Sequence, residues 1–223
     1  PVEEIAISIN NALAAVKTSD ARALAAMLWD DELRAFAWEK EKFSSEKYSA
    51  INHHEEAYRH NGPFLFCEKE KARTGVLLVH GFLASPAEVL AYGEYIRDKG
   101  FNVLGVRLAG HGTSPADLNA RDWEEWLESV RDSYEILSAF CDQVIIVGFS
   151  VGGTLALLLA SEKPAELNSV VTVCAALEVQ NKGMIFSSMM NTINSFVRIF
   201  PRVDGLMNYK RSATRHVLTN YRN

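Results

Sequence analysis

The sequence predicts an α/β fold in which a mainly parallel β-sheet is covered by helices on both faces. From Phe64 onward, short runs rich in β-branched and aromatic residues alternate with longer helical stretches, as in βαβ units. Most of these short runs are apolar throughout, which is typical of strands buried on both faces. The chain has 223 residues, 48% of them hydrophobic and 23% charged, and so contains enough apolar material for one sizeable core.

Five strands and three helices account for residues 64–174. The helix expected over 86–99 stops at Gly100, and the helix over 122–140 opens with acidic residues that suit the positive end of a helix dipole. The third helix is expected over 152–161. The predicted strands are 64–67, 76–79, 101–106, 144–147 and 170–174.

Residues 1–60 differ from the rest because they are charged and lack strand-like runs. Apolar residues recur every three or four positions along 5–16 and along 21–42, which predicts two or three helices. We therefore expect three parts. They are a helical N-terminal extension for packing or homo-oligomer formation (1–60), the α/β core (61–177), and a helical, Met-rich segment that is either like a cap or lid or one more buried amphipathic helix (178–223).

The overall charge argues against nucleic acid and anionic membrane surfaces as partners. Lys and Arg number 23 against 28 Asp and Glu, so the net charge is −5 and no strong positive field exists. No apolar run approaches the ~18 residues of a membrane span, and acidic residues stand where a secretory signal would carry basic ones. Cys67, Cys141 and Cys174 form no C-x-x-C pair, so we expect a reduced, cytoplasmic protein.

The strongest motif is Gly148-Phe149-Ser150-Val151-Gly152, which lies between an apolar strand and an apolar helix. This G-x-S-x-G pattern is typical of a tight strand-to-helix turn that exposes a nucleophilic serine, here Ser150. The helix start directs free N–H groups toward an oxygen bound there. The alternative interpretation is a glycine-rich turn that carries a solvated serine.

A second motif, His80-Gly81-Phe82, directly follows the strand at 76–79. Acyl transfer requires two N–H donors directed at the developing oxyanion, and we assign them to the backbone of Phe82 and Val151. His80 is interpreted as a histidine that braces the turn rather than one that transfers protons.

A third motif, residues 107–115, follows the strand at 101–106 and contains Gly110-His111-Gly112. Ligands of open α/β sheets bind at this edge, so the loop is expected to line the site, with His111 stabilising its turn. Trp123 and Trp126, which follow it, are expected to anchor their helix in the core.

Together the HGF-x-x-SP, LAGHGTSP and GFSVGG runs resemble the α/β-hydrolase superfamily over about residues 64–174, and more narrowly bacterial carboxylesterases and monoacylglycerol lipases. The resemblance implies a serine hydrolase of carboxylic esters, with Ser150 as nucleophile and the N–H groups of Phe82 and Val151 as the oxyanion hole. It implies no metal and no organic cofactor.

The chain departs from this superfamily after Cys174. There the acid and the histidine of the triad are expected after Ser150 on further strands, none of which is evident. His216 is the only later histidine, and Asp204 is the acid nearest before it, too close to hold the expected helix and strand. We therefore expect a hydrolase fold that is incomplete at its C-terminus, with the true acid and base absent from this chain.

The resulting functional hypothesis is hydrolysis of short, medium or monoacylglycerol-like esters through an acyl-enzyme on Ser150. Small-molecule esters would be the substrates. Two alternatives remain open: a non-catalytic hydrolase scaffold that binds a ligand or partner, and a peptidase or lactonase of the same fold.

Overall fold

The computed structural model describes residues 21–52, 62–67 and 72–177. The expected helix along 5–16, the cap segment at 178–223, and with it Asp204 and His216, lie outside these residues. No helix within the described ranges is both long and apolar enough to cross a membrane.

The described elements begin with a long helix, α2 (Ala21–Phe43), which is followed by two short helical turns and the α/β region. The turns are η1 (Glu46–Tyr48) and α3 (Ser49–Asn52). In the α/β region the elements in chain order are β1 (Phe64–Phe66), β2 (Ala72–Val79), α4 (Ala87–Asp98), β3 (Asn102–Val106), α5 (Pro115–Leu118), α6 (Trp123–Ser138), β4 (Cys141–Phe149), α7 (Val151–Ser161) and β5 (Leu167–Val173).

The five strands form one sheet in the order β1-β3-β2-β4-β5. Strands β3, β2, β4 and β5 are parallel, and β1 is antiparallel to β3. In the central register, Leu77 of β2 pairs with Leu104 on one side and Ile146 on the other. The predicted mainly parallel sheet is therefore confirmed.

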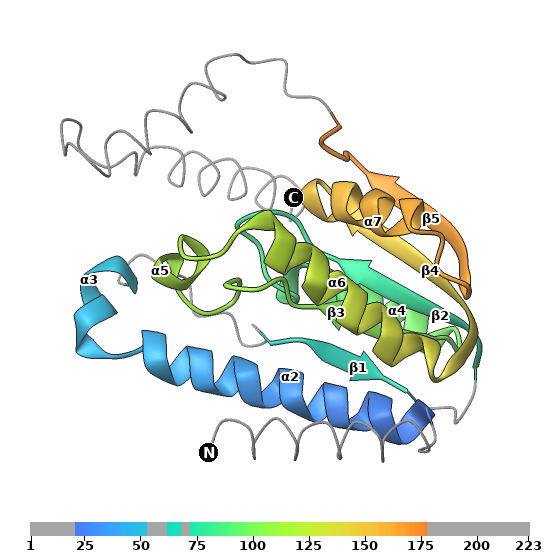
Figure 1. Cartoon of the computed structure of the whole chain (residues 1–223), viewed down its shortest axis with the longest axis horizontal. Coiled ribbons are helices and arrows are strands. Elements are labelled where there is room, and N and C mark those ends of the chain that lie inside the picture. The colour runs from blue at the N-terminus through green and yellow to red at the C-terminus, as the bar shows by residue number, and fades with distance from the viewer. Residues whose placement is uncertain (1–20, 53–61, 68–71, 178–223) are drawn as a thin grey trace, which may run out of the picture. The chain divides into compact units, whose positions relative to one another are not determined.

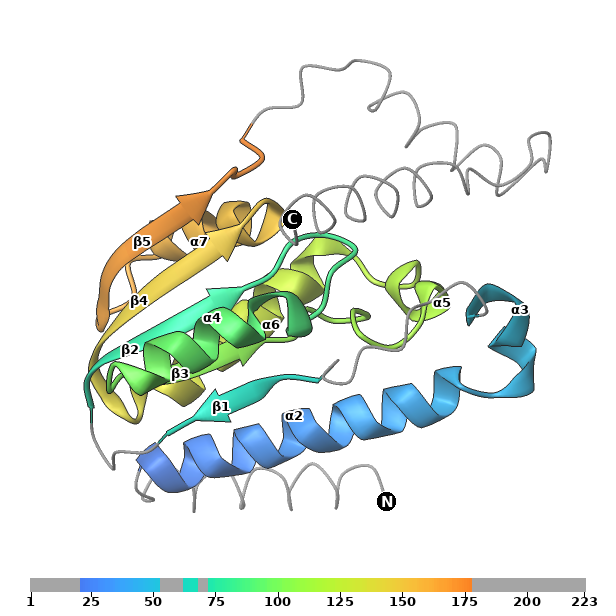
Figure 2. The ribbon, with the colours of Figure 1, turned by 180° about the vertical axis from the view of Figure 1, so that it is seen from behind.

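Alternate residues of β2 face the two helical layers, as the two-residue repeat of a strand requires. Leu77 and Val79 belong to a core cluster with residues of α6 and α7, whereas Val76 and Leu78 pack with Val89 of α4. Figure 1 shows α6 and α7 in front of the sheet, and Figure 2 shows α4 over its opposite face. The prediction that helices cover both faces is confirmed.

Helix α2 packs on the layer that contains α6. Its Ala25 is buried in the larger core cluster, and Leu28 and Trp29 pack against the same cluster. The helix runs along the β1 side of the sheet in both views (Figures 1 and 2). Part of the predicted extension thus contributes to the core of the α/β region.

Three local expectations need correction. Strands β2, β4 and β5 begin earlier than predicted because their polar starts also pair. Gln143 donates to Thr74 at 2.8 Å, and Asn168 donates to Gln143 at 3.1 Å. The short helix α5, which begins at the last residue of the third motif, was not predicted. Trp123 is not a core anchor: it is 50% exposed as the first residue of α6, whereas Trp126, one turn later, packs against the core.

Candidate functional site

The turn that carries Ser150 joins β4 directly to α7, and we call residues 148–153 the serine turn. Ser150 has φ 54° and ψ −118°, a backbone conformation that is unfavourable for every residue except glycine. Its N–H donates to the carbonyl of Val173 at 2.8 Å, which ties the turn to the end of β5. Ser150 is partly exposed, and its hydroxyl makes no capping bond to α7.

Gly148 and Gly152 of the serine turn are required by close backbone contacts. A Cβ on Gly148 would lie 2.4 Å from the carbonyl oxygen of Gly152. A Cβ on Gly152 would lie 2.4 Å from the carbonyl oxygens of both Val79 and His80. The second contact shows that the end of β2 lies directly against the start of α7.

The histidine turn, residues 80–84, therefore lies beside the serine turn. A Cβ on Gly81 would be 3.5 Å from the Cβ of Ser150 and 3.5 Å from the carbonyl oxygen of Phe149. Phe82 follows Gly81 immediately, and Val151 is the first residue of α7, whose first amide groups have no acceptor within the helix. The two predicted oxyanion donors thus belong to two adjoining turns on either side of Ser150.

His80 is fully buried and binds backbone atoms through both ring nitrogens. Its Nδ1 lies 2.9 Å from the carbonyl oxygen of Gly81, and the N–H of Leu108 donates to its Nε2 at 3.3 Å. Because a carbonyl only accepts and an amide N–H only donates, the ring carries its proton on Nδ1 and is neutral. This agrees with the interpretation of His80 as a bracing residue.

Aromatic rings extend from the histidine turn to α6. The ring of His111 lies 5.0 Å from that of His80, 6.1 Å from that of Phe82 and 5.5 Å from that of Trp126, and Phe82 lies 5.5 Å from Trp126. His111 is buried, and its Nδ1 lies 3.2 Å from the carbonyl oxygen of Ala109. It stabilises its loop, as expected, and also contacts Phe82.

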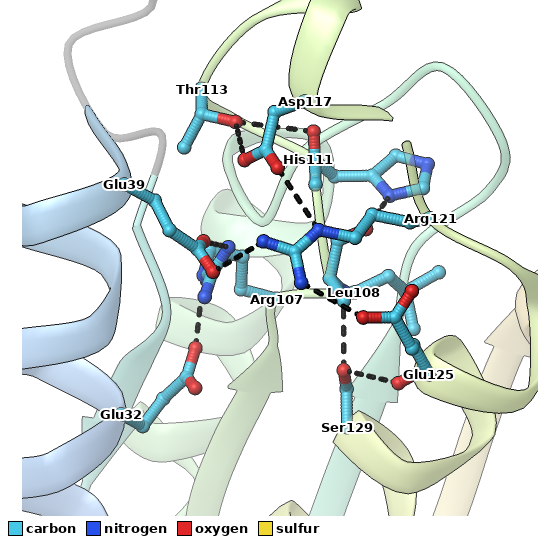
Figure 3. Close-up of polar contacts among 12 residues, drawn as sticks. Glu32, Glu39, Arg107, Leu108, His111, Thr113, Asp117, Arg121, Glu125 and Ser129 are labelled. Atoms are coloured by element: carbon cyan, nitrogen blue, oxygen red, sulfur yellow. Dashed lines mark hydrogen bonds and ion pairs between the residues drawn. The ribbon is translucent and has the colours of Figure 1, made fainter. Parts of the chain in front are cut away.

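The loop that carries His111, residues 107–122, is here called the GHG loop, and buried ion pairs hold it (Figure 3). Arg107 donates from Nε to Glu32 and from Nη1 to Glu39 of α2, both at 2.9 Å. Arg121 donates to Glu39 at 2.8 Å and to Asp117 at 3.0 Å. The Glu39 carboxylate therefore binds both ends of the GHG loop.

Several further contacts complete this network. Arg121 also donates to Glu125 at 2.8 Å, and the hydroxyl of Thr113 donates to the buried Asp117 at 2.7 Å. Burial raises the pKa of Glu32, while its partner Arg107 acts in the opposite direction. Burial by itself lowers the pKa of Arg121, but hydrogen bonds to Glu125 and Asp117 outweigh it and raise that pKa.

Sequence reasoning missed this network, although part of its signal was available. Glu32, Phe36 and Glu39 are spaced four and three residues apart and so share one face of α2. The Arg107 guanidinium, which directly follows an apolar strand, lies over the Phe36 ring at 5.2 Å and between the two carboxylates. Nothing in the sequence indicates that this face of α2 meets this arginine.

Comparison with known proteins gives the chain its family. The family model described as serine aminopeptidase, S33, matches residues 70–222. The chain belongs to this family. Its S33 match includes the serine turn, the histidine turn and the GHG loop, and excludes α2.

Curated relatives and a solved structure agree with this S33 assignment. The chain is 34% identical over 135 residues to a thermostable monoacylglycerol lipase of Bacillus sp. (strain H-257), covering 60% of this chain and 50% of that one. It is 29% identical over 144 residues to a carboxylesterase of Bacillus subtilis (strain 168), covering 64% and 55%. The chain thus spans about half the length of these relatives.

A structure from work on the metagenome-derived lipolytic enzymes LipS and LipT matches with a TM-score of 0.53 and 28% identity, covering 58% of this chain and 52% of that one. The predicted α/β-hydrolase fold is thereby confirmed.

Proposed function

We propose that this protein is a serine hydrolase that cleaves carboxylic esters through an acyl-enzyme on Ser150. The observation that carries the proposal is the position of Ser150, a strained and partly exposed residue between the start of α7 and Gly81 of the histidine turn. A serine in this place can meet an ester carbonyl while amide groups from two segments face the carbonyl oxygen.

The proposed reaction begins with attack of the Ser150 hydroxyl oxygen on the ester carbonyl carbon. The carbonyl electron pair moves onto oxygen, and the N–H groups of Phe82 and Val151 stabilise the oxyanion. When the tetrahedral intermediate collapses, the C–O bond to the alcohol breaks and the acyl group stays on Ser150. Water then attacks the acyl-enzyme and releases the carboxylic acid.

A general base must accept the proton of Ser150 and return it to the leaving alcohol. His80 does not fill this role, because both of its ring nitrogens bind backbone atoms. His111 is buried in its loop, with Nδ1 against the carbonyl oxygen of Ala109, and we propose that the base and its orienting acid lie outside the described residues.

We propose esters of short or medium acyl chains, including monoacylglycerols, as substrates. Phe149 directly precedes Ser150 in the chain, and Phe82 follows Gly81, which lies beside Ser150. The two rings are 41% and 40% exposed and so offer apolar surface for an acyl chain. The relatives named as a monoacylglycerol lipase and a carboxylesterase support the same substrate class.

The test is covalent labelling of the full-length protein with a fluorophosphonate, followed by mass spectrometry of the adduct. We expect a phosphonyl group on Ser150, and hydrolysis of p-nitrophenyl esters that disappears in Ser150→Ala. Ser161→Ala, at the exposed end of α7, is the matched control and should keep both properties. Labelling that spares Ser150, or ester cleavage that survives Ser150→Ala, would contradict the proposal.

We also propose a cytoplasmic location, a division of the chain at residues 60 and 177, and homo-oligomer formation through the N-terminal helices. The three cysteines are free thiols, which suits a reducing compartment.

The proposed oligomer would use apolar surface on α2. The exposed apolar residues of this helix include Leu24, Met27, Leu33 and Trp38. Sedimentation of the wild type and of Met27→Glu tests the oligomer. The charged side chain should dissociate only an oligomer that forms through α2.

A further inference from the structure

We propose that Glu39, on the N-terminal helix α2, is a positioning residue for the N–H group of Phe82. The inference rests on the proposed function, because it assigns to α2 a part in aligning the oxyanion hole. The route has three links: an ion pair from α2 to Arg107, a hydrogen bond from the next residue to His80, and a hydrogen bond from His80 to the peptide that contains the Phe82 N–H.

The first link fixes Arg107. Its side chain is nearly inaccessible to solvent, and Glu32 and Glu39 both accept hydrogen bonds from it at 2.9 Å. Glu39 is itself only 8% exposed, so the pair lies where an unpaired carboxylate or guanidinium is strongly disfavoured. The guanidinium therefore has one favourable position, and this holds the end of β3 (Figure 3).

The second link runs from Arg107 to His80. The peptide bond between Arg107 and Leu108 carries the N–H that donates to Nε2 of His80 at 3.3 Å. A shift of the Arg107 side chain moves this peptide, because the side chain and the peptide share one Cα. The buried His80 ring then loses or tilts the hydrogen bond that it accepts from the GHG loop.

The third link orients the donor. Nδ1–H of His80 donates to the carbonyl oxygen of Gly81 at 2.9 Å, and that carbonyl shares a peptide plane with the N–H of Phe82. In a trans peptide the C=O and N–H point in opposite directions. Holding the oxygen of Gly81 therefore sets the direction of the Phe82 N–H, and the hydrogen bond also polarises the amide.

Glu39 also holds the far end of the GHG loop. Its second oxygen accepts from Arg121, which in turn binds the buried Asp117. From α3, Asn52 accepts a hydrogen bond of 2.6 Å from Ser114 in the same loop. The loop presents His111, whose ring contacts those of His80 and Phe82, so a displaced loop disturbs the histidine turn by a second path.

The chain contains a matched control for this network. Arg131 of α6 also binds two glutamates, Glu128 at 2.8 Å and Glu162 in a short contact. These side chains are substantially exposed. The Glu128 pair lies within α6 and the Glu162 pair joins α6 to the end of α7, so neither involves the GHG loop. Arg131→Gln therefore removes an arginine with two glutamate partners without touching the proposed route.

The test compares Glu39→Gln and Arg131→Gln in the full-length protein. We expect Glu39→Gln to lower kcat for a p-nitrophenyl ester about tenfold, less than the ~10²–10³ of losing an oxyanion donor outright, with KM changed less than about twofold. Glu39→Gln should weaken the binding of a trifluoromethyl ketone by the same factor, because the hemiketal oxyanion of this inhibitor occupies the oxyanion hole. Hydrogen exchange of segment 80–84 should accelerate. Arg131→Gln should change none of these.

A double mutant tests the route itself. If Glu39 acts mainly through His80, Glu39→Gln causes a much smaller loss of kcat in a His80→Ala background than in the wild type. Full additivity of the two losses would contradict the proposal, as would a Glu39→Gln protein whose kcat, ketone affinity and exchange at 80–84 equal those of the wild type. If Glu39→Gln does not fold, Glu32→Gln serves instead, because it removes only one partner of Arg107. It should lower kcat and ketone affinity and accelerate exchange at 80–84, each by a smaller factor.

The proposal and the proposed function fail in different ways. If the wild type cleaves no ester and Ser150 takes no fluorophosphonate, the proposed function is wrong. Faster exchange at 80–84 in Glu39→Gln, but not in Arg131→Gln, would still support the positioning contact. If the wild type is active and Glu39→Gln raises only KM, the function stands and the positioning role is overturned.

Discussion

The serine turn and the histidine turn adjoin at the carboxyl ends of β4 and β2, yet different interactions hold them. The serine turn is fixed by backbone packing: its glycines touch carbonyl oxygens at distances that leave no room for a Cβ. The histidine turn is fixed by side chains from distant segments, through His80, the GHG loop and α2. Both turns therefore depend on tertiary contacts, but backbone atoms hold the serine turn and side chains hold the histidine turn.

This contrast explains which parts of a hydrolase site tolerate change. A backbone contact too close for a Cβ permits only glycine at that position, because backbone atoms cannot move aside. A turn held by remote side chains can be adjusted by changing those side chains, as α2 does here from outside the family match. Four substitutions test this contrast through the free energy of unfolding, measured by urea denaturation of the full-length protein.

The largest loss is expected from Gly152→Ala in the serine turn. The added Cβ would lie 2.4 Å from two carbonyl oxygens of the β2 end, and backbone cannot rotate away as a side chain can. We expect a destabilisation of about 4 kcal/mol or more, or failure to fold. A loss below about 1 kcal/mol would show that the serine turn is not sterically fixed.

His80→Ala should cause the next largest loss of stability, because it disrupts the histidine turn. It removes a fully buried ring and leaves the Leu108 N–H and the Gly81 carbonyl without the ring nitrogens that they bind. Cavity formation and the lost hydrogen bonds together predict a destabilisation of about 3 kcal/mol. An unchanged urea midpoint would mean that other contacts hold the turn.

Ser150→Gly should stabilise the protein, in contrast to the two changes above. Glycine relieves the strain of φ 54° and ψ −118°, whereas Ser150→Ala keeps a Cβ in the same conformation. We expect the glycine variant to be more stable than the alanine variant by about 1 kcal/mol, with neither cleaving esters. Equal stability of the two would argue that the turn stores no strain.

The smallest effect is expected from Gly81→Ala in the histidine turn. Its Cβ would approach the Phe149 ring at 3.1 Å, and this exposed ring can move by a few tenths of an ångström. We expect a destabilisation below about 1 kcal/mol. A loss as large as that of Gly152→Ala would erase the distinction between the two turns.

The same contrast explains how much the sequence could predict. The strands, the helices around them and the turn at Ser150 follow from short-range patterns, because an apolar strand, a glycine-flanked serine and an apolar helix are adjacent in the chain. The fold class is confirmed, while the roles of Ser150, Phe82 and Val151 stay predictions. The ion pairs of Glu39 were not predicted, because Arg107 lies 68 residues away and the meeting depends on where α2 packs.

Trp123 shows the limit of composition as a guide to burial. A tryptophan in an amphipathic helix was expected in the core, but its place at the first position of α6 turns it outward, and the core is reached only at Trp126. The two tryptophans are three residues apart and share one face of α6, so position along the helix, which the cap residue Asp122 sets, decides their burial.

The separation of 68 positions between Glu39 and Arg107 also has a consequence for biosynthesis. At the ~5–20 residues per second of translation, α2 emerges from the ribosome roughly 3–14 s before the arginine that neutralises its carboxylate. During that interval the nascent helix has no guanidinium to receive it, so it stays hydrated and undocked. The Glu39–Arg107 pair consequently forms only after the chain has been synthesised past the end of β3.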